Sequence, residues 1–172
     1  MSEPGKPHEL VDLARRAITA YLSGRPLLKE EVPDYQDEPA GAFVSLKKEG
    51  RLRGCIGTIY PVQPTLVREI VDNAVSAATR DPRFLPLTLE ELDDIAISVD
   101  VLGKPEPVAG LKDLDPSRYG VIVKCGGRKG VLLPDLPGVA TAEEQVRIAR
   151  QKAGIGEGEN VELERFEVRR YT

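Results

Sequence analysis

Strand-like segments in this sequence come in adjacent pairs, and this pairing limits the fold more than any other feature. Residues 42–47 and 51–60 are separated only by a Lys-Glu-Gly turn, and residues 120–125 and 130–134 flank a Gly-Gly-Arg-Lys turn. Two strand-forming segments joined by a short, glycine-containing turn are typical of a β-hairpin, whose strands run antiparallel. Residues 95–101 add another strand, because β-branched residues alternate there with small or polar ones. The sequence therefore predicts a mostly antiparallel sheet.

Three helices are predicted around these strands. Apolar residues recur at helical spacing in residues 7–21 and 65–80, and Thr141 and Glu144 have the spacing of a capping box ahead of a third apolar stripe. The helices do not alternate regularly with single strands, so the βαβ pattern of a parallel sheet is disfavoured. We expect an α+β fold in which helices flank the mostly antiparallel sheet.

Domain organisation is predicted from the length of the chain and from one proline-containing stretch. Because 172 residues are enough to bury a real core, residues 1–172 are expected to form a single domain. Residues 103–118 contain three prolines and predict a long connection. This connection is expected to separate a main lobe from a smaller lobe within about residues 103–140.

The last segment, residues 161–171, is predicted to be a strand that returns to the main lobe. Its alternation of apolar and polar residues changes phase between Leu163 and Phe166. A β-bulge inserts one extra residue into a strand and shifts the phase in this way. We therefore expect a bulge between these two residues.

The small number of cysteine and histidine residues excludes several kinds of site. The chain has two cysteines, Cys55 and Cys125, and one histidine, His8. A zinc site with four side-chain ligands, a Ser-His-Asp triad and a Cys-His pair are all disfavoured unless His8 folds back into a site, and no metal site is expected. A disulfide is not expected in a reducing compartment. No cofactor is identified by the sequence.

Charge and hydropathy bear on partners and location. The net charge is -4 with acids and bases mixed, so nucleic-acid binding is not expected. No apolar run approaches the ~20 residues that span a bilayer, and the amino terminus lacks the apolar core of a secretory signal, so we expect a cytoplasmic protein without a membrane partner. The candidates for a local basic patch are Lys124, Arg128 and Lys129, together with Arg165, Arg169 and Arg170.

The most unusual stretch is Leu-Arg-Gly-Cys-Ile-Gly-Thr at residues 52–58. Glycine permits positive φ and the close approach of a ligand or another backbone, and exposed amides beside Arg53 could bind an anion. A positive environment also favours the thiolate form of Cys55, which is the nucleophilic form. Cys55 is therefore the candidate catalytic residue, and Arg53, Gly54 and Gly57 are candidate ligand-binding residues.

A structural explanation of the same stretch stays open. Cysteine is among the most buried residue types, and Gly-Cys-Ile-Gly is also compatible with a strand packed beneath a helix. A second cluster, Thr-Arg-Asp-Pro-Arg-Phe at residues 79–84, contains Asp81 and Arg83. Asp81 could accept from a backbone amide or pair with an arginine, or it could simply end a helix before Pro82.

The hexapeptide Leu-Arg-Gly-Cys-Ile-Gly resembles the hallmark motif of the AMME-candidate-region domain family, whose prokaryotic members are called AmmeMemoRadiSam system protein A. The similarity continues in the expected order along residues 10–171. Further matching segments are residues 41–46, 81–86, 91–92, 97–99, 130–134 and 151–155. The sequence departs from many members after Leu133, where a cysteine and an aromatic-rich stretch are often found. No role of that carboxy-terminal face is therefore carried over.

The resemblance implies a two-lobed α+β fold around a mostly antiparallel sheet. It also implies that six residues line or support a common cleft, namely Arg53, Gly54, Cys55, Gly57, Asp81 and Arg83. It further implies an association with a Memo-domain protein and a radical S-adenosylmethionine (SAM) enzyme in a modification pathway. It supplies no reaction.

Three hypotheses follow, in this order. The first is a component that binds a small ligand or a protein partner around Cys55 without catalysing a reaction. The second is a cysteine-dependent enzyme with Cys55 as nucleophile, assisted by Arg53, Asp81 or Arg83. The third is a protein associated with nucleic acid.

Overall fold

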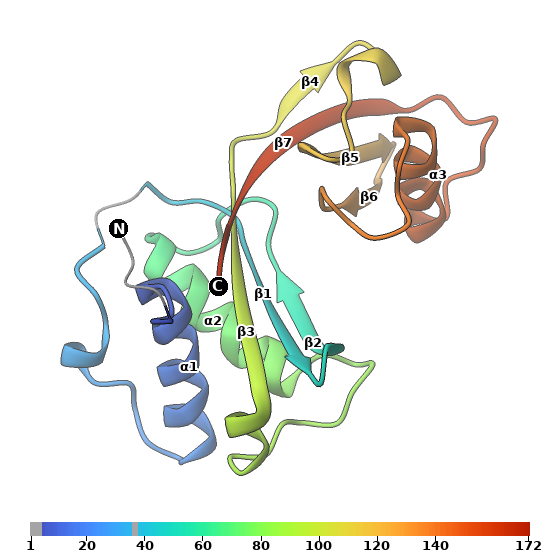
Figure 1. Cartoon of the computed structure of the whole chain (residues 1–172). Coiled ribbons are helices and arrows are strands. Elements are labelled where there is room, and N and C mark those ends of the chain that lie inside the picture. The colour runs from blue at the N-terminus through green and yellow to red at the C-terminus, as the bar shows by residue number, and fades with distance from the viewer. Residues whose placement is uncertain (1–4, 36–37) are drawn as a thin grey trace. The chain divides into compact units, whose positions relative to one another are not determined.

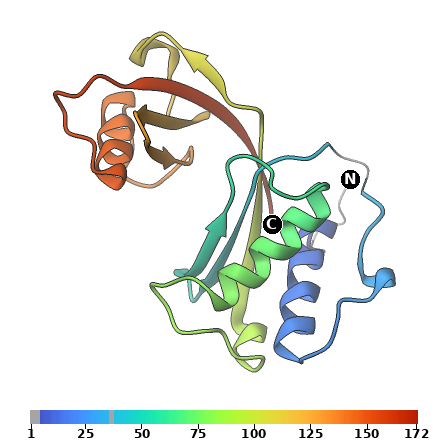
Figure 2. The same ribbon diagram turned by 180° about the vertical axis from the view of Figure 1, so that it is seen from behind.

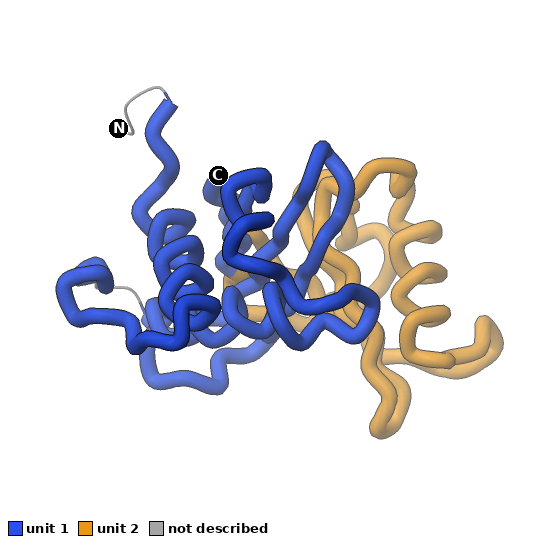
Figure 3. Tube along the Cα trace, turned by 90° about the horizontal axis from the view of Figure 1, so that it is seen from below, with its two compact units in different colours: residues 1–101, 169–172 blue, residues 102–168 orange. Residues whose placement is uncertain are grey.

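A computed structural model describes residues 5–35 and 38–172 and divides the chain into two compact units. Unit 1 consists of residues 1–101 and 169–172, and unit 2 consists of residues 102–168 (Figure 3). Unit 2 begins near the start of the predicted connection and extends past residue 140. The last residues of the chain belong to unit 1.

The described part of unit 1 contains helices α1 and α2, the antiparallel strands β1, β2 and β3, and the last residues of β7, Glu162–Tyr171 (Figure 1). Strand β1 lies in the middle, between β2 and β3. Two short 3-10 helices, Lys29–Glu31 and Glu91–Asp94, complete the unit. The bounds are α1 Glu9–Leu22, β1 Ala42–Lys48, β2 Arg51–Gly57, α2 Leu66–Thr79 and β3 Ile95–Leu102.

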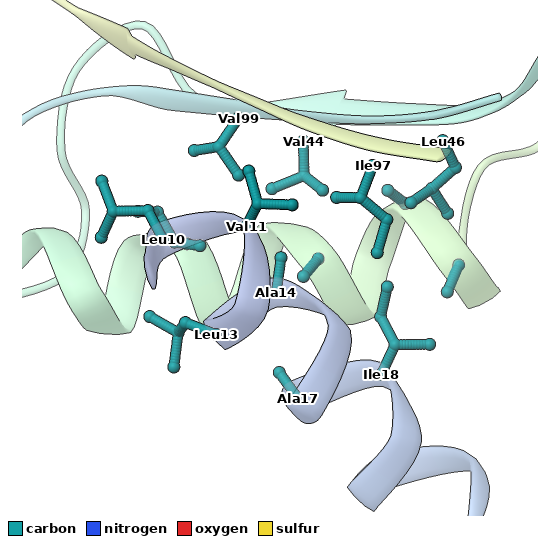
Figure 4. Packing of buried hydrophobic residues seen from close by; sticks show 14 of the residues in the cluster. Leu10, Val11, Leu13, Ala14, Ala17, Ile18, Val44, Leu46, Ile97 and Val99 are labelled. Atoms are coloured by element: carbon teal, nitrogen blue, oxygen red, sulfur yellow. The ribbon is translucent and has the colours of Figure 1, made fainter. Parts of the chain in front are cut away.

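The core of unit 1 lies between the two helices and one face of the sheet (Figures 2 and 4). Val44, Leu46 and Val99 are fully buried on that face, against apolar residues of α1 and α2 such as Leu10 and Ile70. Successive side chains of a strand point to opposite faces of a sheet. The residues between these apolar positions therefore point away from the helices, onto what we call the helix-free face of unit 1.

Capping side chains fix the starts of the helices. The Thr65 side chain accepts a hydrogen bond from the Arg68 amide at 3.2 Å, and Thr141 does the same for Glu144 at 3.2 Å. The His8 imidazole caps α1, because its Nδ1 accepts from the Leu10 amide at 3.2 Å. These contacts satisfy amides that the first turn of a helix leaves without partners.

Unit 2 contains four strands and one helix around a separate core. Its strands are antiparallel in the order β6-β5-β7-β4. The helix packs on β5 and β6, where Val121, Val123 and Ala149 are fully buried. The bounds are β4 Glu106–Val108, β5 Tyr119–Cys125, β6 Arg128–Leu132, α3 Ala142–Ala153 and β7 Glu162–Tyr171.

The predicted α+β class, with a mostly antiparallel sheet, is confirmed. Both hairpins form, and the three helices lie where their apolar stripes predicted. Within the residues that the structure describes, no helix has both the length and the apolar character needed to cross a bilayer.

The predicted bulge between Leu163 and Phe166 is wrong. Strand β7 pairs with β5 without interruption from Glu162 to Glu167. The change of phase arises because Leu163 lies opposite Val123, on the face covered by α3, whereas Phe166 is buried on the other face. A strand with buried residues on both faces does not show simple alternation. A register shift occurs instead in β1, between Leu46 and Lys47.

The stretch 103–118 is more structured than predicted. It contains the short strand β4, which pairs with β7, and a 3-10 turn at Leu111–Asp113. A strand of three residues that includes Pro107 gives no alternation signal, so the sequence could not reveal it.

Candidate functional site

A row of three small polar side chains crosses the helix-free face of unit 1. Ser45 of β1 lies directly opposite Cys55 of β2 on one side and Ser98 of β3 on the other. The Cys55 Sγ and Ser45 Oγ atoms are 3.2 Å apart, within hydrogen-bond distance for sulfur. All three side chains are partly exposed. We call these residues the Cys55 row.

The next row along the same face is aromatic and charged. Phe43 lies opposite Gly57 and Asp100. A Cβ atom at Gly57 would be 2.2 Å from Cγ of the Phe43 ring, so the ring occupies the place of the missing side chain. Asp100 is only 2% exposed and accepts from Arg170 Nε at 2.8 Å and Nη2 at 2.9 Å.

Gly54 has a packing role on the opposite face. A Cβ atom there would be 2.3 Å from the Ala77 carbonyl oxygen, so glycine lets the backbone of α2 approach β2 closely. Neither Gly54 nor Gly57 has positive φ, and both lie in β2, whose pairing with β1 is irregular only at Arg53. The expected bend with exposed amides therefore does not form. The ligand-binding role of these two glycines stays a prediction.

Asp81 and Arg83 close the outer edge of β2 at Cys55. The Cys55 amide donates to Asp81 Oδ2 at 3.0 Å, and Arg83 Nη2 donates to the Cys55 carbonyl at 3.4 Å. Arg83 also donates to Asp81 from its amide at 3.1 Å, from Nε at 3.0 Å and from Nη2 at 2.8 Å. The two side chains thus satisfy backbone groups that an edge strand otherwise leaves exposed. We call this arrangement the edge clasp.

The electrostatics of the edge clasp are those of a tight ion pair. The hydrogen bond from the Arg83 side chain holds the pKa of Asp81 far below its ordinary range, although burial of this carboxyl acts in the opposite direction. The hydrogen bond to Asp81 raises the pKa of Arg83 in turn. Asp81 is 5% exposed, whereas 55% of the Arg83 side chain is exposed. The carboxylate is therefore fixed and ionised, and the guanidinium reaches solvent.

Arg53 forms a second, separate set of contacts along the same edge. Its Nε and Nη2 donate to the two oxygens of Glu91 at 2.8 and 3.1 Å, and its Nη1 donates to the Leu85 carbonyl at 2.9 Å. The hydrogen bond from Arg53 lowers the pKa of Glu91. Each terminal nitrogen of Arg53 already has a protein acceptor, so this side chain fastens the loop after α2 to β2.

The single histidine, His8, does not take part in the contacts of the Cys55 row or the edge clasp. The His8 ring caps α1 and stacks on Tyr171 with ring centroids 4.2 Å apart. In the part of the chain that the structure describes, no cluster of three or more His, Cys, Asp or Glu side chains is placed to hold a metal ion. Both cysteines are free and partly buried.

Four of the six candidate basic residues pair with carboxylates, including Arg170 with Asp100. Lys124 pairs with Glu164 at 2.5 Å, and Arg128 pairs with Glu159. Arg165 pairs with Glu106 at 2.7 Å. Such pairing reduces the local positive charge on which non-specific nucleic-acid binding depends.

Sequence reasoning found Cys55, Asp81 and Arg83 but missed Ser45, Ser98 and Phe43. The alternation within each strand places each of these three residues on the polar face of its own strand. Which residues then lie opposite one another depends on register, which the sequence does not specify. Glu91 entered the sequence analysis only within the matching segment 91–92, because its contact with Arg53 spans 38 positions.

Comparison with known proteins gives a consistent result. A model of the AMMECR1 family matches residues 11–172. A protein of Thermotoga maritima is 52% identical over 169 residues, which are 95% of this chain and 97% of that protein. A protein of Clostridium acetobutylicum is 50% identical over 166 residues, which are 94% of this chain and 35% of that protein.

A solved structure has the same fold. The crystal structure of the uncharacterized protein PH0010 from Pyrococcus horikoshii matches with a TM-score of 0.84 and 32% sequence identity. The match covers 96% of this chain and 91% of that chain.

Proposed function

We propose that this chain, which belongs to the AMMECR1 family, is a binding component that holds a small ligand against the Cys55 row. The observation that carries the proposal is the row itself. Ser45, Cys55 and Ser98 present two hydroxyls and a thiol side by side on a partly exposed sheet face, with the Phe43 ring next to them. A few convergent polar groups beside an aromatic surface are typical of small-molecule sites.

The edge clasp supports binding more than catalysis. A cysteine nucleophile without a histidine needs another base or a strongly stabilised thiolate. Asp81 is the nearest carboxylate to the Cys55 backbone, but both of its oxygens already accept hydrogen bonds and its low pKa makes it a poor proton acceptor. Glu91 is occupied by Arg53 and Lys48 in the same way. Catalysis by Cys55 therefore stays the second hypothesis.

We place the protein in a modification pathway with a Memo-domain protein and a radical SAM enzyme. Membership of the AMMECR1 family supports this proposal, because the resemblance to that family implies the association. The relative from Clostridium acetobutylicum adds support, because the region matching this chain is 35% of that protein and is joined there to further sequence. Nucleic-acid binding ranks last, because four of the six candidate basic residues are paired with carboxylates.

Retention of small molecules from a cell extract tests the proposal. The wild-type protein is incubated with the extract, separated by gel filtration and analysed for bound metabolites by mass spectrometry. Cys55→Ser is expected to retain the same molecule, because it preserves the size and polarity of the row. Ser98→Leu is expected to lose it, because the change removes one hydroxyl of the row and covers the β3 end of the row with a larger apolar side chain.

Circular dichroism and thermal unfolding serve to confirm that both variants fold. Equal retention by Ser98→Leu would place the ligand elsewhere. Loss of the molecule from folded Cys55→Ser would show that the thiol itself is needed and would move catalysis or covalent attachment to first place.

A further inference from the structure

We infer that the Cys55 site selects ligands with an anionic oxygen group, a carboxylate or a phosphate, and that Arg83 Nη1 is the group that binds it. This inference rests on the proposed function, because it names the class of ligand that the same site takes. The observation behind it is the geometry of the Arg83 guanidinium group.

Arg83 uses only part of its hydrogen-bonding capacity within the protein. Nε and Nη2 face Asp81, and Nη2 also reaches the Cys55 carbonyl. Among residues 5–35 and 38–172, Nη1 donates no hydrogen bond. A guanidinium carries five N–H donors in a fixed plane, so two of them remain available on Nη1. Since more than half of this side chain is exposed, these donors are open to a ligand.

The guanidinium is also held in place before any ligand arrives. Asp81 binds it in bidentate fashion, and its carbon lies 5.4 Å from the centroid of the Phe84 ring. A fixed arginine loses little conformational freedom when it binds an anion. Asp81 itself is anchored by the Cys55 amide. The buried carboxylate thus positions the arginine beside the thiol.

Arg53 provides the contrast within the same motif. All three of its guanidinium nitrogens have protein acceptors, and only 17% of its side chain is exposed. The sequence predicts an anion contact from Arg53, whereas the contacts in the structure favour Arg83 for this role. Because Arg83 lies next to Cys55, the alkylation rate of the thiol should depend on the charge of the reagent, and this dependence can be measured.

The experiment compares two alkylating reagents of similar size on Cys55 in a Cys125→Ser background. Iodoacetate is an anion and carries a carboxylate, whereas iodoacetamide is neutral. In both cases the thiolate displaces iodide and forms a thioether. We expect the ratio of the iodoacetate rate to the iodoacetamide rate to fall about fivefold in Arg83→Gln, the effect of one unit charge a few ångströms away in a partly solvated site. Arg83→Lys should retain most of the ratio, because it keeps the charge.

Arg80→Gln is the matched control, because Arg80 is three residues away and, within residues 5–35 and 38–172, its side chain hydrogen-bonds only to Ser76 Oγ, at 3.5 Å. This variant should leave the ratio unchanged. If Arg83 had only a structural role, Arg83→Gln would change both rates together and leave their ratio constant, and that result would overturn the inference while the proposed function stood. If neither reagent labels folded protein, the face is closed and both proposals fail.

Acetate and inorganic phosphate, added at equal ionic strength with chloride as reference, distinguish the two kinds of anion. An anion whose oxygen group binds at Arg83 is expected to slow the labelling of Cys55 by iodoacetamide. An anion that does not bind there should leave the labelling rate unchanged. Slowing by one anion and not by the other would assign the ligand group. Slowing by neither, or equal slowing in Arg83→Gln, would contradict the inference.

Discussion

The two units of this protein share one topology and differ in what they present on the sheet face away from the helix. In unit 1, the order along the chain is β1, β2, α2, β3, and the strands lie in the order β2-β1-β3. In unit 2, the order along the chain is β5, β6, α3, β7, and the strands lie in the order β6-β5-β7. Each unit is therefore an antiparallel ββαβ arrangement in which the first strand lies in the middle.

The helix packs on the second strand in the same way in both units. A Cβ atom at Gly54 would be 2.3 Å from the Ala77 carbonyl oxygen, and one at Gly130 would be 1.9 Å from the Ala149 carbonyl oxygen. An aromatic ring also lies over a glycine of a neighbouring strand in each unit, Phe43 in unit 1 and Phe166 in unit 2. These shared features belong to the architecture and do not indicate a function.

The faces away from the helices are different. In unit 2, that face carries Ile122 and Phe166, which are 0% and 1% exposed. In unit 1, it carries the partly exposed Cys55 row. The cysteines show the same difference, because Cys125 packs against the apolar cluster beneath α3, whereas Cys55 points away from α2. This difference supports the proposal that the binding face is that of unit 1.

The largest expected effect tests the shared packing. Gly54→Ala and Gly130→Ala each force a Cβ atom against a helix carbonyl, so we expect each to lower the free energy of unfolding by about 3 kcal/mol or to prevent folding. Urea unfolding followed by circular dichroism measures this. Gly127→Ala is the control, because no atom lies within 4 Å of its Cβ position. A small effect at only one of the two sites would break the proposed equivalence of the units.

The next effect is the loss of stability when one carboxylate is removed, Asp81 in unit 1 or Glu159 in unit 2. Asp81→Asn is expected to destabilise the protein by about 2 kcal/mol, because an amide would direct N–H donors toward Arg83 in a buried position. Glu159→Gln should lower the free energy of unfolding by less, because 41% of the Glu159 side chain is exposed and water can replace its contacts with Arg128. Chemical denaturation of both variants tests this order. Equal losses would show that the edge clasp is not special to unit 1.

A smaller effect is expected in the pH dependence of stability. The pKa of Asp81 is lower in the folded protein than the value of about 4 in the unfolded chain, so the folded state binds fewer protons. The stabilisation is therefore present above about pH 5 and is lost progressively as the pH falls below that value. Asp81→Asn should flatten this part of the stability curve. An unchanged slope between pH 5 and pH 3 would contradict the assignment.

Local patterns in the sequence predicted the elements of the fold but not the contacts between them. Thr65 and Thr141 cap helices because an N-cap depends on residues only three apart, and Asp81 ends α2 because proline follows it. The contact from Asp81 to the Cys55 amide spans 26 positions and exists only once α2 lies on the sheet. The sequence could indicate that Asp81 and Arg83 matter, but not that they bind to each other and leave one nitrogen open.

The same limit applies to the glycines of the motif. Their spacing suggested a bend that binds anions, because glycine is common in such bends. Gly54 and Gly57 instead lie in β2, where one admits a helix backbone and the other admits the Phe43 ring. Both partners come from distant parts of the fold or from the facing strand, so only the assembled structure distinguishes packing from ligand binding at these positions.

The most direct test of the account is the labelling of each cysteine in the folded protein. Iodoacetamide is applied to two variants, Cys125→Ser, which retains Cys55, and Cys55→Ser, which retains Cys125, and the rates are followed by intact mass from pH 6 to pH 9. We predict that Cys55 reacts at least about tenfold faster than Cys125, because Cys55 lies on the helix-free face, whereas Cys125 packs against the apolar cluster beneath α3 and also contacts Arg128 and Glu159. If Cys55 reacts only after denaturation, or no faster than Cys125, the Cys55 row is a packing feature and unit 1 does not carry the binding face.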